Sequence, residues 1–124
     1  TEVRAIPAAG GQARTVAREA AAFPFDRGRM LTWTPDGQSV VFVRVREGAR
    51  SQLVRVSIPG GSEHPVTDLL SDYPYDTNPA YSPDGKTLAF VRWSGFAIAD
   101  VWIAPCGPDG SAIAQPRPLT REGK

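Results

Sequence analysis

The sequence predicts an all-β fold built from repeated, short antiparallel strands. Residues 33–44 closely resemble residues 81–92, at a constant offset of 48 residues. The chain has 12 Gly and 12 Pro among its 124 residues, a composition rich in turn formers. A period of roughly 20–50 residues is typical of solenoids, propellers and other repeat arrays, so the repeat defines the architecture.

Each copy of the repeat centres on a Pro-Asp-Gly tripeptide, at 35–37 and at 83–85. Proline presets the backbone for a turn, aspartate accepts hydrogen bonds from the following amides, and glycine takes a positive φ easily. Strands rich in β-branched and aromatic residues are expected directly after these turns, over 40–45 and 88–93. Asp36 and Asp84 suggest paired catalytic carboxylates, but turn capping accounts for both.

A second repeated unit consists of a strand, a glycine-bearing turn and another strand, which predicts a hairpin. It occurs at residues 3–16, 52–67 and 100–120. The last copy departs from the others, because it carries a longer Pro/Gly loop at 105–110.

Four strands in each repeat predict one blade of a β-propeller. The expected parts are a half blade at 1–17, a linker at 18–28, a blade at 29–67, a linker at 68–77 and a blade at 78–124. These antiparallel four-stranded blades form a partial, open ring, because a half blade and two blades cannot close one. Exposed blade faces then point either to a fragment of a larger propeller or to self-association.

The connections between blades carry the candidate binding residues. Phe-Pro-Phe-Asp at 23–26 recurs as Tyr-Pro-Tyr-Asp at 73–76. Aromatic rings beside a carboxylate suit a recognition patch near the central channel of a propeller. The alternative is that the rings pack between blades and the aspartates cap the loops. The candidate ligand- or partner-binding residues are Phe23, Phe25, Asp26, Tyr73, Tyr75 and Asp76.

The composition leaves little room for catalysis. His64 is the only histidine and Cys106 the only cysteine, so no disulfide forms within the chain and a Cys- or His-rich metal site is not expected. Neither a Gly-x-Ser-x-Gly motif nor a phosphate-binding glycine loop occurs. Asp72, Asp76 and Asn78 have loose calcium-like spacing but lack the calcium-loop pattern. We therefore expect no enzyme activity, no catalytic residue, no metal and no cofactor.

Four further residues are explained by structural roles alone. His64 is expected on an exposed strand and Cys106 as a plain loop thiol. Arg44 and Arg92 repeat at equivalent positions, which is more typical of blade support than of ligand recognition.

Charge and hydropathy narrow the range of partners. The formal net charge is +1, from 14 basic and 13 acidic side chains, and the arginines are scattered along the chain. This pattern does not favour nucleic-acid binding, which needs a clustered basic face. No apolar run reaches the roughly 18 residues needed for membrane insertion. We expect a protein partner, or other copies of the chain bound through the open blade ends.

The complete pattern resembles a known repeat. An aromatic residue, Ser/Thr-Pro-Asp-Gly, an aliphatic and Phe-containing strand, Gly-Gly and a closing aliphatic-Thr are similar to the TolB-type, WD40-like propeller repeat. The resemblance covers nearly the whole chain. It implies a non-enzymatic binding module like those of bacterial periplasmic or regulatory proteins. The alternative is the accessory propeller of a larger hydrolase or peptidase. A periplasmic location is compatible with the resemblance, and a cytoplasmic one stays open.

Overall fold

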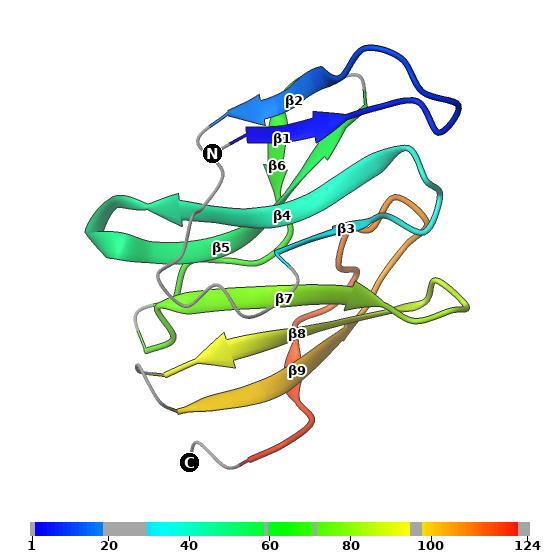
Figure 1. The fold of residues 1–124 in the computed structure, drawn as a ribbon. Helices are drawn as coiled ribbons and strands as arrows, with labels where there is room; N and C mark the ends of the chain where they lie inside the picture. The colour runs from blue at the N-terminus through cyan, green and yellow to red at the C-terminus, as the bar shows by residue number, and fades with distance from the viewer. Residues whose placement is uncertain (1, 19–29, 59, 71, 95–97, 122–124) are drawn as a thin grey trace.

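The computed structural model describes residues 2–18, 30–58, 60–70, 72–94 and 98–121, and these form three antiparallel β-sheets lying in a row (Figure 1). Over these residues no helix has the length and apolar character needed to cross a membrane. The elements are β1 Glu2–Ala5, β2 Arg14–Arg18, β3 Leu31–Trp33, β4 Ser39–Arg46, the short 3-10 helix η1 Glu47–Ala49, β5 Arg50–Ser57, β6 Glu63–Pro65, β7 Tyr75–Tyr81, β8 Thr87–Trp93, β9 Ala99–Pro105 and β10 Arg117–Pro118.

The three sheets are a half blade and two complete blades. Strands β1 and β2 pair with each other, and each four-stranded sheet follows chain order, β3-β4-β5-β6 and β7-β8-β9-β10. The fold class expected from the sequence, antiparallel blades in an open ring, is confirmed. We call the two complete sheets the middle blade and the last blade.

Strand β7 begins within the segment expected to be a linker. It starts at Tyr75, whereas the last blade was expected to start at residue 78. Its pairing with β8 shifts register between Thr77 and Ala80, and Asn78 there takes a left-handed φ of 54°. This β-bulge absorbs the irregular residues and lets the ladder continue back to Tyr75. The expected linker at 18–28 falls almost wholly outside the described residues.

The Pro-Asp-Gly tripeptides form the expected turns. The Asp36 carboxylate accepts hydrogen bonds from the Gln38 amide at 3.0 Å and from the Thr34 hydroxyl at 2.7 Å. The Asp84 carboxylate accepts the equivalent hydrogen bonds from the Lys86 amide at 3.0 Å and from the Ser82 hydroxyl at 2.6 Å. These bonds hold the pKa of both carboxyl groups below the usual range. The turn-capping interpretation of both aspartates is confirmed.

The middle blade is buried on both faces, because successive side chains of a strand point to opposite sides of its sheet. We call the contact of the half blade with the middle blade the first interface, and that of the middle blade with the last blade the second interface. The buried hydrophobic residues of the first are Val3, Val16, Ala17, Val40, Phe42, Val54 and Val56. Those of the second are Val41, Val43, Leu53, Leu88, Phe90 and Cys106.

Among the described residues, the last blade is covered on one face only. Residues of β8 alternate between buried and half-buried, whereas β4 is buried continuously from Ser39 to Arg44. The half-buried positions Ala89 and Val91 pair across the ladder with Ile103 and Val101. We call these four residues the open face. At the repeat offset of 48, Val91 corresponds to Val43, which the last blade covers.

The irregular loop at 105–110 fastens the last blade to the middle blade. The Asp36 amide donates to the Pro108 carbonyl at 3.0 Å, across the two blades. The Cys106 thiol is buried and donates to the Gly85 carbonyl at 3.3 Å. Cys106 thus lies in this loop, as expected, and its side chain is also part of the core of the second interface. His64 lies on β6 and is exposed, as expected.

The equivalent residues Val43 and Val91 test directly whether the middle blade is covered on both faces and the last blade on one. Val43→Ala should lower the free energy of unfolding by about 2 kcal/mol, because two buried methyl groups are lost and a cavity is left. Val91→Ala should cost less than about 1 kcal/mol, because the open face is only partly removed from water. Urea unfolding of both variants measures the difference. Equal losses would contradict the assignment of the open face.

Candidate functional site

The residues that the sequence marked for binding do not all come together. Phe23, Phe25 and Asp26 lie outside the described residues. Tyr73 lies in the connection before β7, whereas Tyr75 and Asp76 belong to β7 itself. Because neighbouring residues of a strand point to opposite faces, Tyr75 and Asp76 lie on different sides of the last blade.

Asp76 is buried in an ion pair with Arg92 of β8. Its carboxylate accepts from Arg92 Nε at 2.8 Å and from Nη2 at 3.0 Å, and the two residues are 1% and 3% exposed. Burial raises the pKa of the Asp76 carboxyl group, and the bonds from Arg92 oppose that rise. Two parallel charge-assisted bonds also fix the plane of the guanidinium group.

Aromatic rings surround the same guanidinium group. The Arg92 Cζ atom lies 4.7 Å from the centre of the Trp102 ring, 4.9 Å from Phe90 and 5.9 Å from Tyr73. The rings of Tyr73 and Trp102 meet edge to face, with centres 5.3 Å apart. Arg92 thus joins Tyr73 to Asp76, and its position is held by cation–π contacts as well as by the ion pair.

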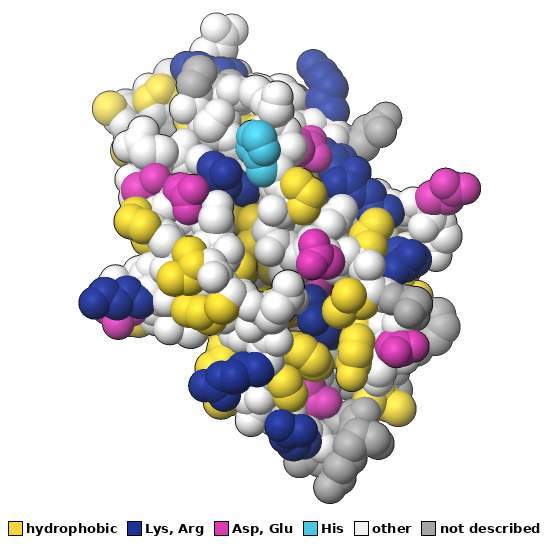
Figure 2. Space-filling model, turned by 180° about the vertical axis from the view of Figure 1, so that it is seen from behind, with side chains coloured by type: hydrophobic (Ala, Val, Ile, Leu, Met, Phe, Trp, Pro, Cys, Tyr) yellow, Lys and Arg dark blue, Asp and Glu magenta, His cyan; other side chains and the backbone are white. Residues whose placement is uncertain are grey.

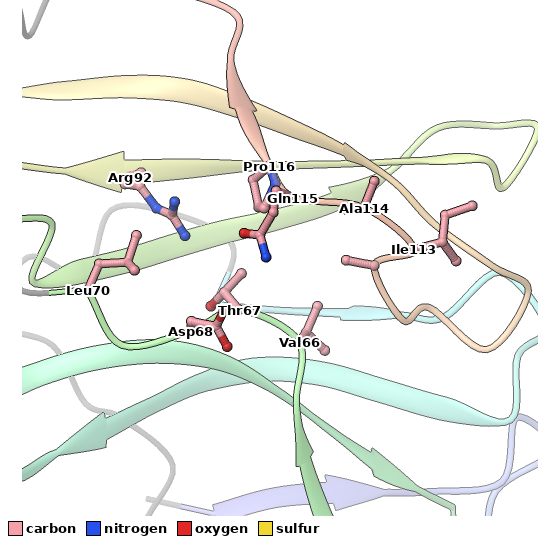
Figure 3. Close-up of a pocket in the computed structure, with 10 residues that line it drawn as sticks. Val66, Thr67, Asp68, Leu70, Arg92, Ile113, Ala114, Gln115 and Pro116 are labelled. Atoms are coloured by element: carbon pink, nitrogen blue, oxygen red, sulfur yellow. The ribbon is translucent and has the colours of Figure 1, made fainter.

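A pocket of about 400 Å³ opens beside Arg92, between the middle blade and the last blade (Figure 3). Figure 3 shows Arg92 pointing into it from β8, with the chain after β6 on one side and the loop before β10 on the other. The lining residues are Val66, Thr67, Asp68, Leu70, Arg92, Ala112, Ile113, Ala114, Gln115 and Pro116. The pocket therefore has a largely polar lining, in which one buried cation, one carboxylate and one amide lie among several apolar side chains.

At the first interface the equivalent arginine makes a contact between blades. There Arg44, the repeat equivalent of Arg92, donates Nη1 to the Arg18 carbonyl at 2.8 Å and also pairs with Glu63. Arg18 corresponds to Asp68 at the hairpin offset of 50. Within the described residues, the Nη1 group of Arg92 makes no hydrogen bond. The Nη1 group thus bonds across the first interface at Arg44 and has no described acceptor at Arg92 in the second.

The sequence marked Asp76 and Tyr73 as candidates, and both contact Arg92, but neither lines the pocket, which the sequence did not predict. Arg92 was interpreted as blade support, and residues 66–70 and 112–116 received no functional interpretation. Two features of the sequence could have indicated the pocket. One is the departure from the repeat at 105–110, and the other is the presence of the repeated arginine Arg92 on the strand that follows Asp76. Among the described residues, no group of three His, Cys, Asp or Glu side chains is placed to hold a metal ion.

One face of the molecule is mixed in character. Figure 2 shows the face that carries His64, the one histidine of the chain, with hydrophobic, acidic and basic side chains interspersed.

Comparison of sequences finds short stretches of similarity to peptidases, and no protein-family model matches the chain. The uncharacterized peptidase YuxL of Bacillus subtilis is 39% identical over 57 residues, which are 45% of this chain and 8% of that protein. Dipeptidyl-peptidase 5 of Porphyromonas gingivalis is 29% identical over 68 residues, 49% of this chain and 10% of that protein. The matched stretches thus make up a tenth or less of these curated relatives.

Comparison of structures shows the fold. The putative TolB from Agrobacterium tumefaciens superposes with a TM-score of 0.70 at 22% identity, over 96% of this chain and 40% of that one. TolB from Acinetobacter baumannii gives a TM-score of 0.59 at 23% identity, over 88% of this chain and 24% of that one. The chain therefore has the fold of part of a TolB-like β-propeller, as its repeat predicted.

The buried ion pair and the exposed carboxylate of the pocket should respond differently to mutation. Asp76→Asn should lower the free energy of unfolding by about 3–5 kcal/mol, because it leaves the buried charge of Arg92 without a counterion. Asp68→Asn should leave stability unchanged, because Asp68 is exposed. Thermal or urea unfolding distinguishes the two. A small effect of Asp76→Asn would show that the ion pair does not stabilise the last blade.

Proposed function

We propose that the chain is a binding module within a larger TolB-like β-propeller, without catalytic chemistry of its own. In this proposal the pocket between the middle and last blades receives a segment of a partner protein. The observation that carries it is the buried guanidinium of Arg92, which is fixed by Asp76 and directed into a pocket of about 400 Å³. Pockets of this size with a few placed polar groups are typical of ligand sites.

The open face supports the placement in a larger ring. Ala89, Val91, Val101 and Ile103 are equivalent to positions that a following blade would cover, and they are only half-buried. The chain also aligns with only 40% of the TolB structure from Agrobacterium tumefaciens. Further blades are the simplest occupant of this face. The alternative occupant is a second copy of the chain that associates through the same face. The mass of the chain in solution distinguishes these two possibilities.

A second candidate is the accessory propeller of a peptidase. The two curated relatives, whose names are those of peptidases, favour it, although each match covers a tenth or less of the relative. The pocket would then receive a segment of the peptide substrate, and catalysis would reside outside these residues. A hydrolase domain in the same reading frame would favour this candidate, and a regulatory domain would favour the first.

The pocket can be tested by filling it. Ala114 is exposed on the pocket wall, so Ala114→Trp should fold normally and occupy the space. Heptapeptides selected from a random library on the native chain should bind this variant at least about 10-fold more weakly, a loss of about 1.4 kcal/mol. Fluorescence polarisation with the selected peptides measures the change.

The matched control is Ala9→Trp, an equally exposed alanine in the β1–β2 hairpin, which should bind the peptides like the native chain. Peptides that bind Ala114→Trp and the native chain equally would place the binding site elsewhere. A selection that yields no binding peptide would contradict the proposed function.

A further inference from the structure

The hydrogen-bonding capacity of Arg92 is only partly used. A guanidinium group carries five N–H donors, and two of them are given to Asp76. Nη1 makes no hydrogen bond within the described part of the chain, and the side chain points into the pocket (Figure 3). Because the ion pair and the aromatic rings already fix this group, a ligand that accepts its hydrogen bonds need not order it first.

The positive charge of Arg92, unlike its free N–H donors, is already neutralised by a neighbouring carboxylate. Asp76, 2.8 Å from Arg92, balances it, and Asp68 adds a second carboxylate on the pocket wall. One positive side chain thus lies near two carboxylates, of which Asp68 lines the pocket and Asp76 is buried behind Arg92. An anionic ligand would be repelled by both carboxylates and would lose its hydration on entering. An uncharged carbonyl oxygen takes the donors of Arg92 without that cost.

Asp68 adds a preference for a cation. Its carboxylate is exposed, and within the described residues it takes part in no ion pair or hydrogen bond. The apolar neighbours Val66, Leu70 and Ile113 line the same opening, and Ile113 is 70% exposed. These surfaces suit the aliphatic stem of a lysine or arginine whose charged end lies near Asp68.

We infer that the pocket recognises a peptide segment in which a main-chain carbonyl lies next to a basic side chain, and that it discriminates against acidic segments. The carbonyl oxygen accepts from Arg92, the basic side chain pairs with Asp68, and the aliphatic stem packs on the apolar wall. This inference rests on the proposed function, since it specifies the peptide that the pocket takes.

The test uses three end-blocked tetrapeptides that differ at one position: Ala-Ala-X-Ala, with lysine, norleucine or glutamate at X. Each is titrated into the full 124-residue chain, and the NMR amide shifts of residues 66–70 and 112–116 are followed. The lysine peptide should bind about 3-fold more tightly than the norleucine peptide, as an exposed ion pair allows, and the glutamate peptide more weakly still. Added salt should reduce the lysine advantage.

Asp68→Asn should remove the lysine advantage and leave norleucine binding unchanged. The matched control Glu47→Gln, at an exposed acid in η1, should keep that advantage. Tighter binding of the glutamate peptide, or equal binding of all three in the pocket, would overturn the inference while leaving the proposed function in place. No shift at 66–70 or 112–116 with any peptide would overturn both.

Discussion

The alternation of side chains along β4 and β5 is the constraint on which the rest of the structure depends. Odd and even positions of these strands enter different hydrophobic clusters, so one sheet is the core of two interfaces at once. A register slip of one residue would exchange the two clusters, which strongly specifies the pairing. Each blade buries its apolar residues only against its neighbours, and the row is stable because the blades are stacked.

The same geometry explains why a pocket forms in the second interface. The guanidinium group of Arg44 joins the middle blade to the half blade by donating a hydrogen bond to the Arg18 carbonyl. In the last blade, Asp76 comes from the bulged strand β7 and takes Arg92 into a bidentate pair. The chain after β6 and the loop before β10 leave room beside it. Within the described residues, the Nη1 group that joins two blades at Arg44 makes no hydrogen bond at Arg92, which makes Arg92 a candidate recognition group.

The predictable features were the ones determined locally. The Pro-Asp-Gly turns, the strands after them and the blade count follow from turn chemistry and alternation within a few residues. The start of β7 was misjudged, because a β-bulge at Asn78 depends on pairing with β8. The burial of Cys106 and the pocket depend on contacts between the irregular loop and the middle blade, which have no counterpart in the repeat.

Native-state amide hydrogen exchange tests the central claim most directly. Strands β4 and β8 are each paired on both edges, so they differ chiefly in whether one or both faces of their sheet are covered. The amides of Phe42 and Phe90 occupy equivalent places in the repeat. If burial between blades stabilises the chain, Phe42 should exchange more slowly than Phe90. Equal protection, or slower exchange at Phe90, would contradict the account.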